Sequence, residues 1–319
     1  MRFNPKARLD TSRTRDVGRS GGGGGLGGGG LGGGMTLPTG KMGAGGIVLV
    51  LVLVLISQCT GVGPDLGSVL GGSASGLDAS RFTDSQGDTG RYANCETGED
   101  ANNNEDCALV AVENSLYDYW GDELGNEFQA ENGVETFTGA VSTGGCGNAT
   151  TDVGPFYCPT DQTIYLDTTF YRDMLEGQLG GEDAPFVRAY VIAHEFGHHI
   201  QNLRGTMGQV RTQQGPKSDS VRLELQADCF AGMWAQAAQS TPDEDGNVLI
   251  SDLTETDITD AIGAATAVGD DYIQNRMGGR SNPESWTHGS SAQRVQWFKK
   301  GMASDNDIDA CDTFAPGAL

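Results

Sequence analysis

The chain has 319 residues, 37% of them hydrophobic, so it can bury one sizeable core, but its 50 glycines are far more than one compact domain needs. The net charge of −23 is unevenly spread: residues 1–45 carry seven basic and two acidic side chains, which gives 7 − 2 = +5 there and −28 for the rest. So acidic a remainder is repelled by phosphate backbones, which argues against nucleic acid as a partner.

The first 41 residues form a basic leader that contains a glycine-rich stretch. Residues 21–34 hold 12 glycines and two leucines. So few side chains cannot build a core, and the stretch is typical of a flexible tether. We therefore expect residues 1–41 to be disordered.

Residues 42–64 contain no charged side chain, and a run of ten strongly apolar residues lies within them at 47–56. Ten residues are short for a membrane span and resemble the apolar part of a signal peptide. The 23 uncharged residues in total, the long leader and the lack of an Ala-x-Ala cleavage site favour a single transmembrane helix instead. The positive-inside rule then places the leader in the cytoplasm and the following residues outside the cell membrane. A cleaved signal, or a lipoprotein acylated at Cys59, is the alternative, although Gln58 stands where a lipoprotein needs a small residue.

Residues 65–91 are rich in glycine, serine and aspartate and predict a linker, so the folded domain should span residues 92–319. Six of the seven cysteines lie beyond the apolar segment. An even number of cysteines in an oxidising compartment predicts disulfides, although six cysteines allow many pairings. Closure of short loops favours the pairs Cys95–Cys107, Cys146–Cys158 and, from the remaining two, Cys229–Cys311. A second zinc site made of cysteines is the rival interpretation, which the absence of a Cys-x-x-Cys spacing disfavours.

Hydrophobic periodicity and turn residues outline a mainly helical domain with a small sheet, which is the α+β class. The sequence predicts short strands at residues 134–138 and 163–167. It predicts helices over residues 106–129, 168–179, 185–203, 221–239, 254–276 and 290–302. Pro185 suits the first turn of its helix, and Asp183 is placed to cap that helix.

Three of the four histidines fall within six residues of the helix predicted at 185–203. His194 and His198 are four residues apart and therefore share one helix face, and Glu195 lies beside the first of them. In this His-Glu-x-x-His arrangement two neutral imidazoles bind zinc, and the glutamate acts as a general base toward water. A structural zinc site would have four protein ligands and no use for this glutamate, so the pattern favours catalysis.

The helix predicted at 221–239 supplies a pair of carboxylates. Glu224 and Asp228 are four residues apart and face the same way. A catalytic zinc needs three protein ligands and one open position, so Glu224 is the candidate third ligand. Asp228 is the candidate acceptor for the outer N–H of His194, which it would orient. The alternative is a solvated surface pair, but like charges at this spacing repel each other unless a cation lies between them.

Two neighbours of the histidine ligands have other expected roles. His199 is rotated by about 100° around the helix from His198 and cannot easily share its metal, so we expect it to pack or to form hydrogen bonds. Gly197 would let another backbone approach the helix closely, at a cost of about 1 kcal/mol in helix propensity.

The fourth histidine, His288, belongs to a loop. A lone histidine in a loop is usually polar surface, but the oxyanion of a tetrahedral intermediate needs a hydrogen-bond donor that no other residue yet supplies. His288 is therefore the candidate donor. Arg294 follows six residues later and would either stabilise the same charge or pair with Asp228.

These stretches together resemble the bacterial neutral zinc metallopeptidase family of membrane-anchored proteins. The resemblance rests on the leader, the single apolar segment, His-Glu-Phe-Gly-His-His-Ile-Gln from residue 194, Glu-Leu-Gln-Ala-Asp-Cys-Phe-Ala-Gly from residue 224 and Cys-Asp-Thr-Phe near the end. The spacing is also similar, more distantly, to membrane metalloproteases of the prenyl-protein and heat-shock type. The resemblance implies one zinc ion with the ligands His194, His198 and Glu224, the catalytic residue Glu195, and support of the transition state by His288 and Arg294.

We therefore predict a zincin-like α+β metallopeptidase domain that hydrolyses a peptide or protein substrate outside the cytoplasmic membrane. The strand at residues 163–167 is expected at the edge of the sheet, where an extended peptide would pair with it. Two alternatives remain open. A zinc-stabilised envelope scaffold that has lost catalysis would hold zinc without cleaving peptides. A binding module whose acidic surface recruits basic partners would keep its partner after His194→Ala.

Overall fold

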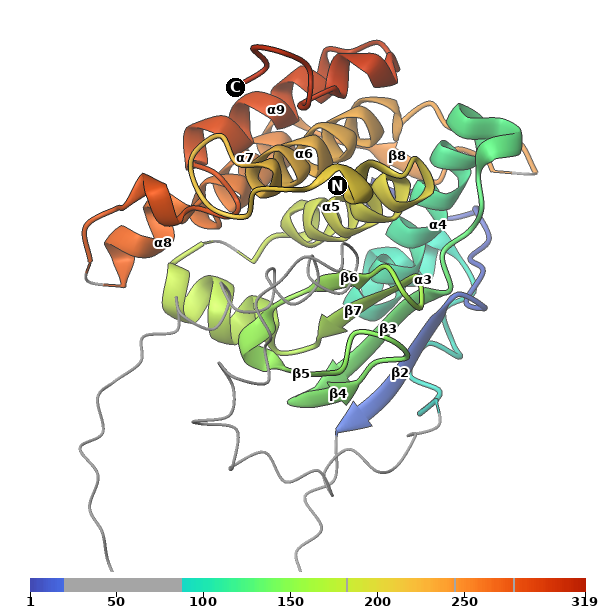
Figure 1. Cartoon of the computed structure of the whole chain (residues 1–319). Coiled ribbons are helices and arrows are strands. Elements are labelled where there is room, and N and C mark those ends of the chain that lie inside the picture. Colours follow the sequence, from blue (N-terminus) through green and yellow to red (C-terminus); the bar gives the residue numbers. More distant parts are fainter. Residues whose placement is uncertain (20–87, 182, 244, 278) are drawn as a thin grey trace, which may run out of the picture.

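The computed structural model describes residues 1–19 and 88–319, apart from 182, 244 and 278. Within these residues it confirms the α+β class, with helices packed over small sheets (Figure 1). The α-helices are α3 (Gly98–Asn103), α4 (Glu105–Leu124), α5 (Pro185–Leu203), α6 (Asp219–Ala237), α7 (Glu255–Ala267), α8 (Asp270–Arg276) and α9 (Ser291–Met302). The strands are β1 (Arg2–Phe3), β2 (Thr14–Arg19), β3 (Gly133–Thr138), β4 (Ala140–Ser142), β5 (Asn148–Thr150), β6 (Phe156–Cys158), β7 (Thr163–Asp167) and β8 (Ile250–Asp252). Shorter helical turns are η3 (Gly125–Glu127), η4 (Thr151–Val153), η6 (Thr206–Gln209), η7 (Pro283–Ser285), η8 (Ile308–Cys311) and the π-helix η5 (Tyr171–Leu179).

Helix α5 lies between the largest sheet and α6, and α9 packs on α6 (Figure 1). Every residue of α5 from Ile192 to Gln201 is buried. A helix that is buried on all sides must satisfy its polar side chains with partners from neighbouring elements. The histidines and the glutamate of α5 therefore have to find such partners on the sheet side or on α6.

Helices α5 and α6 approach each other closely because the residues at their contact are small. A Cβ atom on Gly197 would lie 3.1 Å from both the Cα and the carbonyl oxygen of Ala227, so the close approach expected at this glycine is confirmed. Helices α6 and α9 meet in the same way, since a Cβ atom on Gly232 would lie 2.0 Å from the carbonyl oxygen of Phe298. This spacing brings the carboxylates of α6 within reach of the histidines of α5.

The largest sheet has the strand order β2-β3-β7-β6, with β6 antiparallel to β7 and the other neighbours parallel. All five residues of β7 are buried, which is typical of a strand with neighbours on both sides. The strand predicted at residues 163–167 is confirmed, but its expected place at the edge is wrong. The strand at that edge of the sheet is β6, which also contacts α5.

Residues 1–19 belong to this fold, so the expectation of a disordered leader is wrong for them. Strand β1 pairs antiparallel with β8, and β2 runs parallel to β3, where Thr14 pairs with Val134. The Arg13 guanidinium contacts the Glu113 carboxylate of α4 at 2.6 Å. Two interactions hold these residues in the fold. One is the backbone pairing of the strands, and the other is electrostatic, because basic side chains of the leader neutralise buried carboxylates of an acidic domain.

The predicted membrane span at residues 42–64, the rest of the leader and the linker up to residue 87 lie outside the described residues. The alternatives of a cleaved signal and of acylation at Cys59 fall on the same residues and stay predictions. Among the helices of the described part, none is long and apolar enough to cross a membrane.

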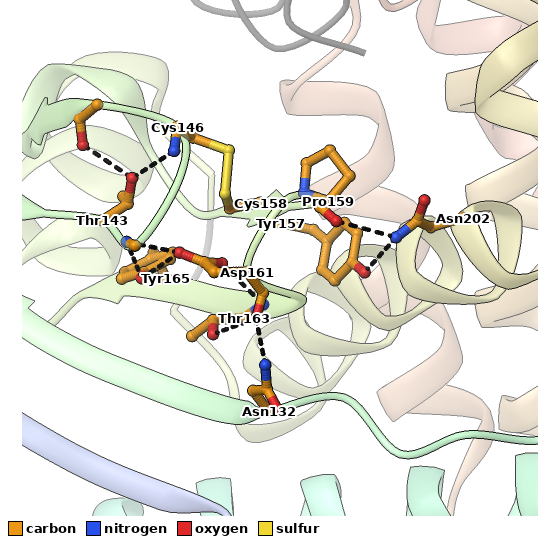
Figure 2. Close-up of a disulfide and its surroundings, with 12 residues drawn as sticks. Asn132, Thr143, Cys146, Tyr157, Cys158, Pro159, Asp161, Thr163, Tyr165 and Asn202 are labelled. Atoms are coloured by element: carbon orange, nitrogen blue, oxygen red, sulfur yellow. Dashed lines mark hydrogen bonds between the residues drawn. A yellow bond between two sulfur atoms is a disulfide. The ribbon is translucent and has the colours of Figure 1, made fainter.

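The three expected disulfides, Cys95–Cys107, Cys146–Cys158 and Cys229–Cys311, are confirmed. The alternative of a second zinc site built from these cysteines is therefore wrong. The bond between Cys146 and Cys158 ties the end of β6 to the loop that joins β4 and β5 (Figure 2). The edge strand is thus covalently fixed at one end.

Several local expectations differ from the structure. The helix predicted at 106–129 ends at Leu124, with Gly125 as its C-cap, and the one predicted at 168–179 is the π-helix η5, which begins at Tyr171. The helix predicted at 254–276 is divided into α7 and α8, because the chain turns at Gly269, where a Cβ atom would lie 2.4 Å from the backbone nitrogen of Ser291. Asp183 does not cap α5, whose N-cap is Ala184. Its carboxylate instead accepts two hydrogen bonds, of 2.6 and 2.5 Å, from the Arg188 guanidinium, which takes it away from the backbone N–H groups of the helix.

Candidate metal centre

Three side chains from α5 and α6 converge on one point. His194 and His198 of α5 and Glu224 of α6 each offer a ligand atom, and these atoms lie within 4.8 Å of one another. The Nε2 atom of His194 is 3.2 Å from one Glu224 oxygen, and the Nε2 atom of His198 is 3.6 Å from the other. Glu224 and Asp228 are only 6% and 0% exposed, so the alternative of a solvated surface pair is wrong.

The outer ring nitrogens of both histidines have partners that set the tautomer. Nδ1 of His194 donates to Oδ1 of Asp228 at 2.9 Å, and Nδ1 of His198 donates to Oε1 of Gln201 at 2.8 Å. A proton on Nδ1 leaves the Nε2 lone pair free on the side of Glu224. Once metal binding has displaced any proton on Nε2, the arrangement presents two neutral imidazoles and one carboxylate, which is a common donor set of a catalytic zinc.

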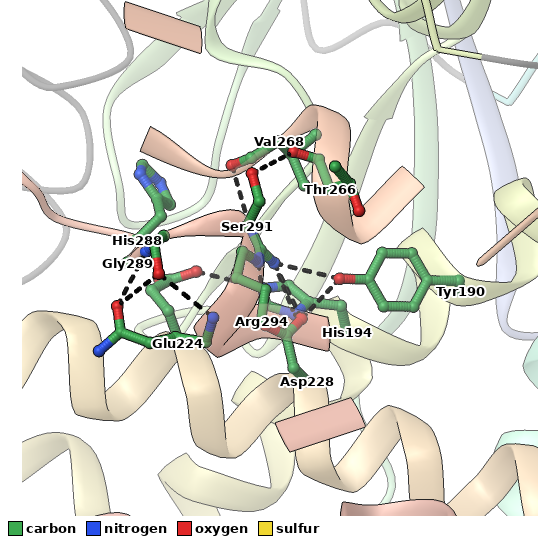
Figure 3. A network of polar contacts seen from close by, with 12 residues as sticks. Tyr190, His194, Glu224, Asp228, Thr266, Val268, His288, Gly289, Ser291 and Arg294 are labelled. Atoms are coloured by element: carbon green, nitrogen blue, oxygen red, sulfur yellow. Dashed lines mark hydrogen bonds and ion pairs between the residues drawn. The ribbon is translucent and has the colours of Figure 1, made fainter. Parts of the chain in front are cut away.

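Asp228 is itself held by Arg294 and Tyr190 (Figure 3). Nε and Nη2 of Arg294 donate to the two Asp228 oxygens at 2.9 Å each, and the Tyr190 hydroxyl donates to Oδ1 at 2.6 Å. Nη2 of Arg294 also lies 3.3 Å from Nδ1 of His194. Burial raises the pKa of Asp228, but the charges of Arg294 and His194 outweigh it and hold the pKa below its usual value. An ionised Asp228 is thus kept beside the outer nitrogen of His194.

The two carboxylates next to the histidines experience opposite shifts. Burial raises the pKa of Glu195, and the charges of His198 and His194 oppose this only in part. Burial also raises the pKa of Glu224, but there the charge of His198 and a hydrogen bond from His194 dominate and the pKa is lowered. Burial lowers the pKa of His194, whereas Asp228 raises it, with a net result of about 9. Glu195 is therefore the carboxylate that takes up a proton more readily, as a general base must.

The charges of the cluster fit a divalent cation. Zinc binds neutral imidazoles, so in the metal-bound site the histidines carry no charge, ionised Glu195, Glu224 and Asp228 contribute three negative charges and Arg294 contributes one positive charge, which leaves 3 − 1 = 2 negative charges around the ion. Buried charge without a counter-ion costs several kcal/mol per group. A Zn²⁺ ion between the nitrogen and oxygen donors would cancel this charge, so both the donor set and the charge fit zinc.

His288 lines the same cavity as Glu195 and Glu224. Its loop is held by Asp270 of α8, whose Oδ2 accepts hydrogen bonds of 2.8, 2.7 and 2.9 Å from the backbone N–H groups of Thr287, His288 and Gly289. Burial lowers the pKa of His288, but the hydrogen bond with Asp270 and the charges of Asp270 and Glu224 raise it by more, so the net shift of this pKa is upward. Asp270 thus positions the loop that carries the candidate oxyanion donor.

Strand β6 borders the cavity and is fixed to α5. The cavity has a volume of about 190 Å³, and its lining includes Tyr157 and Pro159 from β6 and the residue after it. Asn202 of α5 donates to the Tyr157 hydroxyl at 3.0 Å and to the Pro159 carbonyl at 3.2 Å (Figure 2). The edge strand and the helix that carries the histidines are therefore held at a set distance.

His199 turns away from the metal-binding atoms. Its Nδ1 accepts a hydrogen bond from the Tyr157 hydroxyl at 3.0 Å, and its Nε2 donates to the Gln129 carbonyl at 2.7 Å. The side chain is fully buried, and this burial lowers its pKa. The expected role in packing and hydrogen bonding agrees with these contacts, which join α5 to the edge strand.

Three residues of the centre were not predicted from the sequence: Tyr190, Gln201 and Asp270. Two of them carry a helical signal that could have found them. Tyr190 precedes His194 by four residues, and Gln201 follows His198 by three, so each shares a helix face with the ligand it supports. No helical spacing points to Asp270, because Asp270 lies in α8 whereas His288 lies in the loop before α9.

This donor set, with a glutamate base beside it and an edge strand along the cavity, is of the kind that metallopeptidases use. Residues 3–314 match the model of the family described as "Putative neutral zinc metallopeptidase", and the chain belongs to that family. The anchoring of the family in a membrane and the more distant likeness to the prenyl-protein and heat-shock type of metalloprotease stay predictions.

Relatives in other bacteria share much of the sequence. The protein Rv2575 of Mycobacterium tuberculosis (strain ATCC 25618 / H37Rv) is 46% identical over 227 residues, which cover 70% of this chain and 76% of the relative. The protein YpfJ of Escherichia coli (strain K12) is 37% identical over 318 residues, 97% of this chain and 98% of the relative. No solved structure matches the chain. Neither relative's name states an activity, so the activity has to be argued from the residues.

Proposed function

We propose that the chain is a zinc endopeptidase in which His194, His198 and Glu224 bind the metal and Glu195 is the general base. The observation that carries the proposal is the convergence of three ligand atoms within 4.8 Å, beside a buried Glu195, on a cavity bordered by an edge strand. A structural zinc site would be closed by a fourth protein ligand and would not need this glutamate.

The residues around the metal have separable roles in this proposal. A bound zinc ion supplies Lewis-acid polarisation of the scissile carbonyl and makes water a better nucleophile. Glu195 takes the proton of the attacking water and returns it to the leaving amine. His288 donates a hydrogen bond to the oxyanion of the tetrahedral intermediate. Arg294, paired with Asp228, keeps the His194 ring in the tautomer that leaves Nε2 free.

The substrate backbone is proposed to pair with β6. No strand occupies the outer edge of β6 among the described residues. An extended peptide can add to such an edge by main-chain hydrogen bonds, which hold it without regard to sequence. The cavity that contains Glu195 lies along this strand, so a peptide bound there would pass the metal ligands.

We propose that the catalytic domain lies outside the cytoplasm. The support is its three disulfides, because disulfides persist in oxidising compartments. The pairing of β2 with β3 requires residues 1–19 to share the compartment of the catalytic domain. The proposal therefore does not retain a cytoplasmic place for these 19 residues. A single membrane span at residues 42–64 would put residues 1–19 and residues 88–319 on opposite sides of the membrane, so the proposal does not retain this anchor.

Metal analysis combined with cleavage of a fluorogenic peptide library tests this function. The wild-type chain is expected to hold one zinc ion and to cleave peptides. Glu195→Gln should keep the zinc and lose turnover by roughly 10²- to 10⁴-fold, because the shape stays and the base is lost. Glu224→Ala should lose both zinc and turnover, and Glu284→Gln, at an exposed position, is the matched control.

Each result decides between the open alternatives. Turnover that survives Glu195→Gln in a pure sample would remove Glu195 as the base. A wild-type chain that holds zinc but cleaves nothing in the library would favour the zinc-stabilised scaffold. A partner that still binds after His194→Ala, with no cleavage by the wild type, would favour the binding module.

A further inference from the structure

The cavity beside the metal ligands is mostly apolar away from the ligands themselves. Part of its lining comes from three segments that are far apart in the chain: η5 with the residue before it, α5, and α8 with the residue after α7. The apolar side chains there are Phe170, Met174, Leu179, Val191, Val268 and Ile273. They form what we call the apolar wall. Val191 is one helical turn before His194, so the wall begins directly beside the first zinc ligand.

Among the residues that the structure describes, no free charge faces a substrate side chain at this wall. The charged residues that line the cavity are the groups of the metal centre and Arg294. Arg294 is only 4% exposed, and both Asp228 oxygens and the Val268 carbonyl accept hydrogen bonds from it. A charged side chain placed against the wall would lose its hydration and gain no partner, which costs several kcal/mol.

The volume of the cavity suits one large side chain. A cavity of about 150 Å³ accepts a benzene molecule. The present cavity, of about 190 Å³, therefore has room for a side chain of leucine or phenylalanine size together with the reacting groups. Burial of such a side chain contributes about 1.5–3 kcal/mol, which is enough to select among peptides.

We propose that the enzyme selects peptides with a large apolar residue, leucine- or phenylalanine-like, next to the scissile bond, and that the apolar wall binds this residue. The inference rests on the proposed peptide hydrolysis for its substrate class. The main-chain pairing at β6 would be blind to sequence, so the wall is the element that gives the enzyme its preference.

Binding of small hydroxamates to the zinc-loaded protein tests the wall without any turnover. The probes share one scaffold and carry an isobutyl, a benzyl, a hydrogen or a carboxymethyl group next to the metal-binding head. The isobutyl and benzyl probes should bind at least about tenfold more tightly than the hydrogen probe, and the carboxymethyl probe no better than hydrogen. Equal dissociation constants for all four probes would overturn the inference.

A change of charge at the wall supplies the second test. Ile273 of α8 is half-buried and lines the cavity, so Ile273→Asp would place a carboxylate in the pocket. The variant should bind the isobutyl probe about tenfold more weakly and a probe with an aminobutyl group more tightly than the wild type does. Met277, 40% exposed and absent from the cavity lining, gives the matched control Met277→Asp, which should behave as the wild type. If the aspartate unfolds α8, Ile273→Ala serves in its place. It only removes apolar area and should also weaken the binding of the isobutyl probe.

Failure of this inference and failure of the proposed function look different. Cleavage that depends on Glu195 but shows no preference for apolar residues, with unchanged probe affinities in Ile273→Asp, would overturn the wall and leave the peptidase intact. A clear preference for the isobutyl and benzyl probes with no cleavage of any peptide would support the wall and overturn the hydrolysis.

Discussion

The Nδ1–H group of His198 donates a hydrogen bond of 2.8 Å to the side-chain oxygen of Gln201. The amide nitrogen of Gln201 donates in turn to the Leu223 carbonyl of α6 at 2.7 Å. The glutamine is fully buried, so neither bond competes with water. It therefore orients the proposed zinc ligand of α5 and ties it to the residue that precedes Glu224, the proposed ligand of α6.

Replacement of Gln201 should weaken zinc binding without removing a ligand. Gln201→Leu keeps the apolar part of the side chain and deletes the acceptor, so the His198 ring loses its fixed tautomer and orientation. We expect the dissociation constant for zinc to rise by roughly 10- to 100-fold, as measured by competition with a chelator. Gln236→Leu, at an exposed position of α6, is the control. An affinity equal to that of the control would show that Gln201 does not support the site.

The position of Gly197 shows how well local spacing predicts contact between helices. The helix at 185–203 was predicted with its observed bounds, and the glycine between the ligands was expected to allow close approach of another backbone. The start of the helix was read from Pro185, and the close approach was read from the missing side chain of Gly197. The candidate ligands of α5 and α6 follow from spacings of four residues, which helix geometry sets, so only the crossing of the two helices is left to tertiary packing.

Gly197→Val should destabilise the fold by about 1–3 kcal/mol, because the new side chain would meet the Ala227 backbone at 3.1 Å and separate α5 from α6. The free energy of unfolding from urea titrations measures this. Gly263 offers a matched comparison, since it lies in α7 with nothing within 4 Å of its Cβ position. Gly263→Val should leave stability nearly unchanged. Similar losses at both positions would show that the loss at Gly197 does not come from the helix crossing.

The sheet was harder to predict, because its pairings join residues far apart in the chain. Thr14 pairs with Val134, but no local pattern in the polar stretch at residues 14–19 predicts a strand. The same applies to β6, which has three residues and lies antiparallel to β7 at the edge that the sequence assigned to β7. Strand order depends on non-local pairing, whereas the candidate zinc ligands depend on helical spacing, so their convergence was predictable where the order of the strands was not.

Arg13 tests whether residues 1–19 are part of the domain. Its guanidinium contacts the fully buried Glu113 carboxylate and lies 3.9 Å from the centre of the Tyr117 ring. Arg13→Ala would leave that carboxylate buried without a cation, so we expect a loss of about 3–5 kcal/mol in the free energy of unfolding. Arg172→Ala is the control, because Arg172 pairs with Asp173 while 70% exposed and should cost less than about 0.5 kcal/mol. A loss no larger than that of the control would mean that the leader contributes little to the fold.

Glu131 lies beside this ion pair and gives the chain a specific dependence on pH. It is 3% exposed, and neither of its carboxyl oxygens has a hydrogen-bond partner among the atoms of the described residues. Burial and the neighbouring Glu113 carboxylate raise the pKa of Glu131 well above its usual value. In the unfolded chain the same group has a pKa of about 4.3. Below that pH both states are protonated and the group does not affect stability.

As the pH rises above about 4.3, the unfolded chain releases the Glu131 proton while the folded chain keeps it, so stability must fall with pH, by at most about 1.4 kcal/mol per pH unit for this one proton. The loss ends where the folded carboxyl also ionises. Glu131→Gln has nearly the same shape and no titration, so it should become progressively more stable than the wild type between pH 4.5 and 8, as measured by urea unfolding at constant zinc concentration. Glu127→Gln, at an exposed position of η3, should show a flat difference over the same range. A flat or falling difference for Glu131→Gln would mean that this carboxyl is ionised in the folded protein and that Arg13 neutralises it together with Glu113.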